Sequence, residues 1–174
     1  MRTSFAAAKS VPSTTAVVAI PVASDGPLAK EIGLTRAELA AMGFEGKCCT
    51  TLAIAPAAGS KSARVLVGIG SPADITESVM RNIGAAAARA CSRHASMAVA
   101  IPATPRGNRR VMAQAFVEGV ALALHRWAEL KNDKSSVAKL TKVTIVGDAV
   151  DTKAGIVDGV PDDGHLRELR NGGL

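Results

Sequence analysis

The chain has 174 residues, of which 48% are hydrophobic and 21% charged, and this balance is typical of one folded domain rather than of a disordered segment. Aromatic residues make up only 2% of the chain, too few to provide the stacking platforms used by proteins that bind single-stranded nucleic acids. The net charge of +6 favours acidic partners without identifying one, and no apolar run reaches the ~20 residues of a membrane-spanning helix, so no membrane contact is expected.

The first predicted strand covers residues 14–22, which are rich in β-branched and apolar side chains and end at the turn-forming residues 24–27. Residues 1–13 are expected to form an extension ahead of the domain. Residues 28–42 carry apolar side chains near helical spacing, with a break around Gly33, so two short helices are expected there. Thr35 followed by Glu38 is typical of a capping box at the start of the second helix.

Two further apolar runs, at residues 49–55 and 64–69, are joined by a loop at residues 57–61. The length and composition of this loop predict a hairpin, so the two strands are expected to pair in antiparallel orientation.

A Ser-Pro-Ala-Asp segment at residues 71–74 predicts the start of a long helix with an apolar stripe. The next strand is expected at residues 97–101. After a basic loop, a second long helix carries an apolar stripe from Met112 to Trp127 that is too wide for one covered face, which suggests contact with another domain or subunit. Residues 142–146 predict the last strand.

Residues 147–174 are rich in glycine and aspartate, and they are expected to form a flexible acidic tail or a truncated linker. The domain proper is therefore expected to span residues 14–146. Its order of elements predicts a mixed sheet with helices on both faces.

Cysteine usage and the start of the chain bear on the cellular compartment. Three cysteines, two of them adjacent at Cys48 and Cys49, match neither a secreted disulfide framework nor a Cys-x-x-Cys site, and they indicate reduced thiols in the cytoplasm. Lys9 and Pro12 interrupt the opening before it reaches the length of a signal peptide. An organelle transit peptide would also suit the acid-free opening, although that opening runs directly into a strand.

Several segments together resemble the amino-terminal domain of the leucyl aminopeptidases. Phe-Glu-Gly-Lys at residues 44–47 resembles the family's Phe-x-Gly-Lys segment, and residues 64–70 resemble its Val-Gly-Leu-Gly strand end. Ala-Gln-Ala-Phe-Val-Glu-Gly at residues 113–119, continued by His-Arg-Trp at 125–127 and by Lys131, is similar to the family's Ala-x-Ala-x-x-Glu-Gly helix. The resemblance implies a three-layer α/β/α domain, macrodomain-like and with a mixed, mostly parallel sheet. Such a domain precedes a catalytic domain and helps to hold a hexamer together.

The same resemblance implies where the chemistry of such an enzyme lies. The family binds two divalent ions, typically zinc, manganese or magnesium, in a carboxy-terminal domain marked by an Asn-Thr-Asp-Ala-Glu-Gly-Arg segment, and that segment does not occur in this sequence. Two-metal hydrolysis needs several oxygen ligands that converge on the ions. No catalytic residue, metal ligand or cofactor is therefore expected in this chain, whose expected role is to form oligomer contacts, to contact a catalytic domain or to control access to it.

A second hypothesis is a module that binds ADP-ribose or another nucleotide. Gly68, Gly70 and Ser71 fit a Gly-x-Gly-x-x-Ala pattern between a strand and a helix, where backbone amides can hold a phosphate. They are candidates for an anion site, although no acidic residue follows the strand at 97–101 to hold a ribose, and glycines in a tight turn are the simpler explanation.

A third hypothesis is an accessory protein that contacts DNA weakly. The basic loop at residues 106–110 could form a phosphate-binding patch together with four more cations, Lys61, Arg64, Arg89 and Arg93. A solvated charged surface is the commoner explanation of such a patch. The three histidines, His94, His125 and His165, are far apart in the sequence and are expected to be structural or exposed.

Overall fold

A six-stranded sheet forms the centre of the molecule, in a computed structural model that describes residues 3–102, 108–125, 139–147 and 149–159. The strands are β1 (Ser4–Ala8), β2 (Val17–Ala23), β3 (Thr51–Ile54), β4 (Ala63–Gly70), β5 (Ser96–Ala100) and β6 (Lys142–Val146), in the spatial order β1-β6-β5-β2-β4-β3. The first five strands in this order are mutually parallel, and β3 pairs in antiparallel orientation with β4. The mixed, mostly parallel sheet and the hairpin were both predicted correctly.

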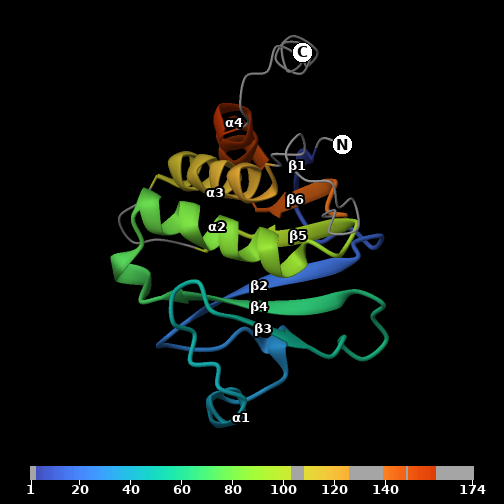
Figure 1. Ribbon diagram of the computed structural model, residues 1–174, viewed down its shortest axis with the longest axis vertical. Coiled ribbons are helices and arrows are strands. Elements are labelled where there is room, and N and C mark those ends of the chain that lie inside the picture. The colour runs from blue at the N-terminus through green and yellow to red at the C-terminus, as the bar shows by residue number, and fades with distance from the viewer. Residues whose placement is uncertain (1–2, 103–107, 126–138, 148, 160–174) are drawn as a thin grey trace, which may run out of the picture.

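Helices lie on both sides of this sheet, so the predicted three-layer arrangement is confirmed (Figure 1). Helices α2 (Glu77–Cys91), α3 (Arg109–Leu124) and α4 (Ala149–Gly159) pack together on one side. Helix α1 (Arg36–Ala41), preceded by the 3₁₀ turn η1 (Lys30–Ile32), lies on the other side near β2 and β4. Within the described residues, no helix is long and apolar enough to cross a membrane.

Alternate residues of the central strands supply two separate apolar clusters, because successive side chains of a strand point to opposite faces of the sheet. The larger cluster joins α2, α3 and α4 to residues such as Val65, Val67 and Met97. The smaller one places Ile32, Leu39 and Phe44, from the α1 side, against residues of the other face, which are Ile20, Val22 and Leu66. Both faces of β2 and β4 are thus covered.

Residues 1–13 are not only an extension, because Ser4–Ala8 forms β1 and pairs with β6 at the edge of the sheet. The sequence conceals this strand because its Ala-Ala-Ala stretch has low intrinsic β-propensity. The strand is held by its backbone hydrogen bonds to β6, which lies far along the chain, rather than by the local β-propensity of its residues.

The long helix does not begin at Ser71, as the sequence suggested. Residues Pro72–Asp74 form the short 3₁₀ helix η2, in which Ser71 makes no capping hydrogen bond with its side chain. Thr76 instead caps α2, since its hydroxyl accepts a hydrogen bond from the backbone amide of Val79. The predicted capping box of α1 is confirmed: Thr35 and Glu38 satisfy each other's backbone amides. The hydrogen bond from the Thr35 amide lowers the pKa of the Glu38 carboxyl.

Helix α4 covers much of the apolar stripe of α3 that was expected to meet another domain or subunit. It lies in the stretch expected to be a flexible tail, and the backbones of α3 and α4 approach closely at Gly155 and Gly159. A Cβ atom at Gly155 would lie 2.4 Å from the carbonyl oxygen of Arg110, and one at Gly159 would lie 2.6 Å from that of Gln114. The glycine content that suggested a tail therefore permits a packed helix.

Helices α2 and α3 meet through a reciprocal contact between two glycines. A Cβ atom added to Gly84 would lie 2.3 Å from the carbonyl oxygen of Phe116, and one added to Gly119 would lie 1.9 Å from that of Arg81. Each glycine thus faces the residue three positions before the other, so neither helix leaves room for a side chain at the crossing. Beside this crossing, the Arg81 guanidinium donates to Glu118 at 2.8 Å, and Gln114 donates to the other oxygen of the same carboxylate at 3.0 Å.

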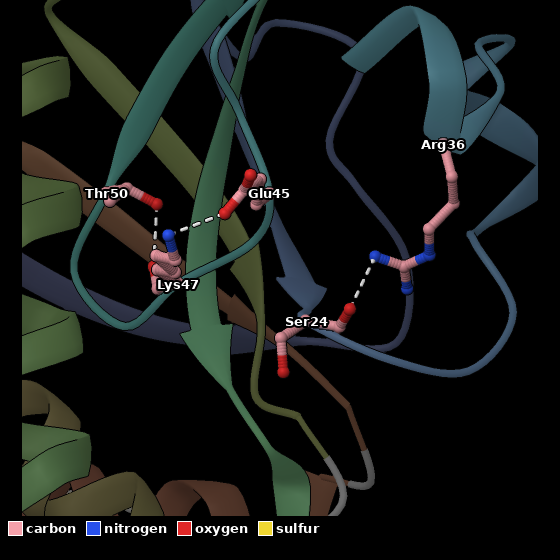
Figure 2. A network of polar contacts seen from close by, with 5 residues as sticks. All are labelled: Ser24, Arg36, Glu45, Lys47 and Thr50. Atoms are coloured by element: carbon pink, nitrogen blue, oxygen red, sulfur yellow. Dashed lines mark hydrogen bonds and ion pairs between the residues drawn. The ribbon is translucent and has the colours of Figure 1, made fainter. Parts of the chain in front are cut away.

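Helix α1 is fastened to the end of β2 by Arg36, its first residue. The Arg36 guanidinium donates to four consecutive carbonyl oxygens, those of Ala23, Ser24, Asp25 and Gly26, over distances of 2.8 to 3.2 Å. Figure 2 shows the guanidinium reaching from α1 to the backbone of Ser24. One side chain therefore holds the chain where it leaves the sheet.

Replacing either crossing glycine is expected to destabilise the fold. Gly84→Ala or Gly119→Ala should lower the free energy of unfolding by about 1–3 kcal/mol, because the added methyl group forces two packed backbones apart and outweighs the higher helix propensity of alanine. Urea unfolding followed by circular dichroism measures the loss. Asn82→Ala, at an exposed position of α2, is the matched control and should leave stability unchanged or slightly raised. Wild-type stability in both glycine variants would contradict the close crossing.

Arg36→Lys is expected to loosen the chain that leaves β2. A single ammonium group cannot reach four carbonyl oxygens, so hydrogen exchange at residues 24–26 should become faster, with a loss of about 1 kcal/mol in stability. Arg93→Lys is the matched control, because it makes the same substitution at an exposed position after α2. It should alter neither the hydrogen exchange at residues 24–26 nor the stability. Unchanged exchange at residues 24–26 in Arg36→Lys would show that the four hydrogen bonds do not hold this turn.

Candidate functional site

The carboxyl ends of β2 and β4 are where a ligand site is expected in a parallel sheet, and they lie side by side here. Residues 46–50 return along the end of β4 and pair with it. The Gly70 amide donates to the Gly46 carbonyl at 2.9 Å, the Gly68 amide donates to the Thr50 carbonyl at 2.8 Å, and the Cys49 amide donates to the Gly68 carbonyl at 2.9 Å. The chain itself therefore covers this part of the sheet edge.

Glycine is required at two of these positions because the backbones lie so close together. A Cβ atom at Gly46 would be 2.6 Å from the Ala23 carbonyl oxygen, and Gly46 also has a positive φ of 74°. A Cβ atom at Gly68 would be 2.0 Å from the Lys47 carbonyl oxygen. The motif at residues 44–47 and the glycine-rich end of β4, noticed separately in the sequence, are two sides of one contact.

A crevice of about 360 Å³ opens beside this contact, between α1 and the end of β2. Its lining combines apolar side chains with the Arg36 turn and the start of the returning segment; the residues are Val22, Ser24, Arg36, Leu39, Ala40, Phe44, Glu45, Gly46 and Lys47. This volume is at the lower end of the range for small-molecule sites.

The charged groups around the crevice are already paired. The Lys47 ammonium lies 2.6 Å from the Glu45 carboxylate, and Figure 2 shows this exposed ion pair beside Thr50, whose hydroxyl donates to the Lys47 carbonyl. The pairing lowers the pKa of Glu45 and raises the pKa of Lys47, so both groups are held in their charged forms. An acid and a base that exchange protons near neutral pH need the opposite shifts, and the crevice has no such pair.

The anion-site candidates do not converge on an open cradle. The backbone amides of Gly68 and Gly70 already donate hydrogen bonds to the carbonyl oxygens of Thr50 and Gly46. Ser71 precedes a 3₁₀ turn rather than the amino terminus of α2. Two of the three amides are thus unavailable to a phosphate. The simpler explanation of these glycines, a close approach of two backbones, accounts for their positions.

One arginine of the candidate DNA patch is used inside the domain. Arg64 donates to the backbone carbonyls of Ala55, Glu31 and Ile32, which connects β4 to the chain around η1. Of the loop at 106–110, residues 106 and 107 lie outside the described residues, whereas Arg109 and Arg110 form the start of α3. Lys61, Arg89 and Arg93 are exposed.

The histidines and acids form no centre for chemistry within the described part of the chain. His94 follows α2 and His125 caps α3, whereas His165 lies outside the described residues. No group of three or more histidine, cysteine, aspartate or glutamate side chains there could hold a metal ion. The described residues therefore offer no ligand set for two divalent ions, which the resemblance assigns to a separate catalytic domain.

Some residues of this region were not singled out by the sequence. Arg36 was missed because an arginine at the first position of a short helix has no signature of its own. Thr50 was also missed, and Cys48 and Cys49 were interpreted only as reduced thiols; their adjacency was the one available signal of a shared turn.

Comparisons with solved structures give the same fold. A mutant of tomato leucine aminopeptidase superimposes with a TM-score of 0.70 at 19% sequence identity, over 89% of this chain and 35% of that one. The bottromycin maturation enzyme BotP in complex with Mn gives a TM-score of 0.66 at 21% identity, over 84% of this chain and 29% of that one. The chain therefore spans about a third of the length of the enzymes that it resembles.

Sequence comparison identifies the family. No curated protein sequence matches the chain significantly. The family model that describes the N-terminal domain of the cytosol aminopeptidase family matches residues 31–134, which include the segments at 44–47, 64–70 and 113–119. The chain therefore belongs to the cytosol aminopeptidase family and corresponds to its N-terminal domain.

Proposed function

We propose that this chain is a non-catalytic domain of a metal-dependent aminopeptidase, in which it forms oligomer contacts or controls access to a catalytic domain. The observation that carries the proposal is the family match over residues 31–134. The structural comparisons support it, since almost the whole described fold superimposes on about a third of a leucine aminopeptidase chain. Release of amino-terminal residues from peptides would then be the work of another domain.

The arrangement of the family motifs supports a structural rather than a chemical role for them. Glu118 binds Arg81 across the helix crossing, Gly119 lets α2 approach, and Gly46 lies against the Ala23 carbonyl. All three are used by packing or hydrogen bonding inside the domain. We include a cytoplasmic location in the proposal, because the family is described as cytosolic and the three cysteines are free.

The outer surface of α3 offers a candidate contact. Leu122 is 66% exposed, the highest value among the large apolar side chains of the described residues. Such a side chain loses contact with water when a partner covers it, which favours association. Within the proposal, Leu122 would contact a second subunit or a catalytic domain.

The purified chain is expected to release no leucine from leucine amide when manganese or zinc is added. The reason is that no described side chains converge to hold the ions that would polarise the carbonyl and activate water. Release of leucine is measured against a metal-only control and against an intact leucine aminopeptidase. Metal-dependent hydrolysis that co-purifies with this chain would overturn the non-catalytic assignment.

Leu122→Asp is expected to shift the chain towards the monomer while leaving its fold intact, since an exposed carboxylate opposes burial in an interface. Sedimentation velocity measures the assembly, and circular dichroism measures the fold. Met42→Asp, at a 46% exposed position next to α1 on the other side of the sheet, is the matched control. Equal assembly of the wild type and Leu122→Asp would exclude this surface as the contact.

A further inference from the structure

Cys48 and Cys49 occupy the two central positions of a tight turn between residues 47 and 50. The Thr50 amide donates to the Lys47 carbonyl at 3.1 Å, and the Thr50 hydroxyl donates to the same oxygen at 2.6 Å. The turn is also attached to β4, because the Cys49 amide donates to the Gly68 carbonyl. Its position relative to the sheet is therefore fixed from both sides.

The backbone of Cys49 has a conformation that side chains other than glycine rarely adopt. Its φ of 65° is the only positive value at a non-glycine residue in the described part of the chain. A positive φ at the second central position alone is that of a type II turn, where glycine is usual. A cysteine there costs conformational energy and points to a use for its thiol.

This turn brings the two thiols together. The Sγ atoms of Cys48 and Cys49 lie 3.1 Å apart. Cys48 is exposed and Cys49 is half-buried, whereas Cys91, the third cysteine, is fully buried in the core. A water-borne oxidant can therefore reach the adjacent pair and not the third thiol.

We propose that Cys48 and Cys49 form a redox site that a hydroperoxide converts reversibly into a disulfide between adjacent residues. With hydrogen peroxide as the oxidant, Cys48 loses its proton and the thiolate attacks one peroxide oxygen. The O–O bond breaks, a sulfenic acid forms at Cys48, and the second oxygen leaves as hydroxide, which takes up the released proton to form water. The Cys49 sulfur then attacks Cys48 Sγ, the S–O bond breaks, and the hydroxide that leaves takes the Cys49 proton to form a second water. Two thiols are oxidised and one peroxide is reduced.

The surroundings of the pair suit this order of events. Burial raises the pKa of Cys49 to about 12, with further contributions from the hydrogen bond to Cys48 and from its charge, while the positive charge of Arg89 opposes the shift. Cys49 is thus the poorer first nucleophile. Oxidation of Cys48 to a neutral sulfenic acid removes the contribution of its negative charge and makes the Cys49 thiol easier to deprotonate for the second step.

The disulfide would be easy to reduce again. Consecutive Cα atoms lie about 3.8 Å apart, closer than the about 4.4–6.8 Å that is usual across a disulfide, so a bond between neighbours is strained. Strained and exposed disulfides are the labile ones. The disulfide would therefore be a reversible modification of the turn rather than a permanent structural cross-link.

Peroxide treatment of the reduced full chain, followed by denaturation, alkylation with N-ethylmaleimide and intact-mass measurement, tests the proposal. Of the three cysteines, only Cys91 should react with N-ethylmaleimide after the oxidation. Reduction with dithiothreitol before alkylation should restore labelling of all three. Peptide mapping should place the loss of two hydrogen atoms within a peptide that contains both Cys48 and Cys49. Retention of all three labels, oxidation that dithiothreitol does not reverse, or a disulfide between two chains on a non-reducing gel would overturn the proposal.

Single variants test the roles of the two thiols. In Cys49→Ser the sulfenic acid has no neighbouring thiol to attack it, so dimedone should label Cys48, whereas in Cys48→Ser dimedone should label neither position. Cys91→Ala should form the disulfide as the wild type does. Formation of an intramolecular disulfide in either serine variant would show that Cys91 takes part and that the adjacent pair is not the site.

Discussion

The close crossing of α2 and α3 is the contact on which the rest of the helical layer depends. Gly84 and Gly119 let the two backbones touch, and this sets how far apart the helices lie above the sheet. The Arg81–Glu118 ion pair fixes the same crossing at its partly exposed side. Helix α4 then lies against the other flank of α3 through Gly155 and Gly159, so glycines define both helix contacts in this layer.

This constraint also explains why the family motifs identify a fold more directly than an activity. The motif at residues 113–119 supplies Glu118 and Gly119 to the helix crossing, and the motif at 44–47 supplies Gly46 to the edge of the sheet. Each glycine is required by a neighbouring carbonyl oxygen rather than by a ligand. A chain that keeps these residues keeps the domain, whatever chemistry takes place elsewhere in its relatives.

The sequence was most informative where a local pattern coincides with the final contact. The hairpin of β3 and β4 and the capping box at Thr35 follow from turn chemistry and short-range spacing, and both were predicted correctly. Strand β1 and helix α4 were missed because their stability comes from partners that are distant in the sequence. Their alanine- and glycine-rich segments have weak local preferences, which tertiary packing overrides. The same limit hid Arg36, whose four acceptors belong to a turn of another element.

The pairing of β1 with β6 has a consequence for how the chain is made. Ser4 pairs with Lys142, so β1 has no partner strand until the residues of β6 have also been synthesised. At roughly 5–20 residues per second this delay lasts for several seconds, longer than most small domains need to fold. Strand β1 therefore stays unpaired during that interval, and its edge of the sheet can close only after β6 has been made.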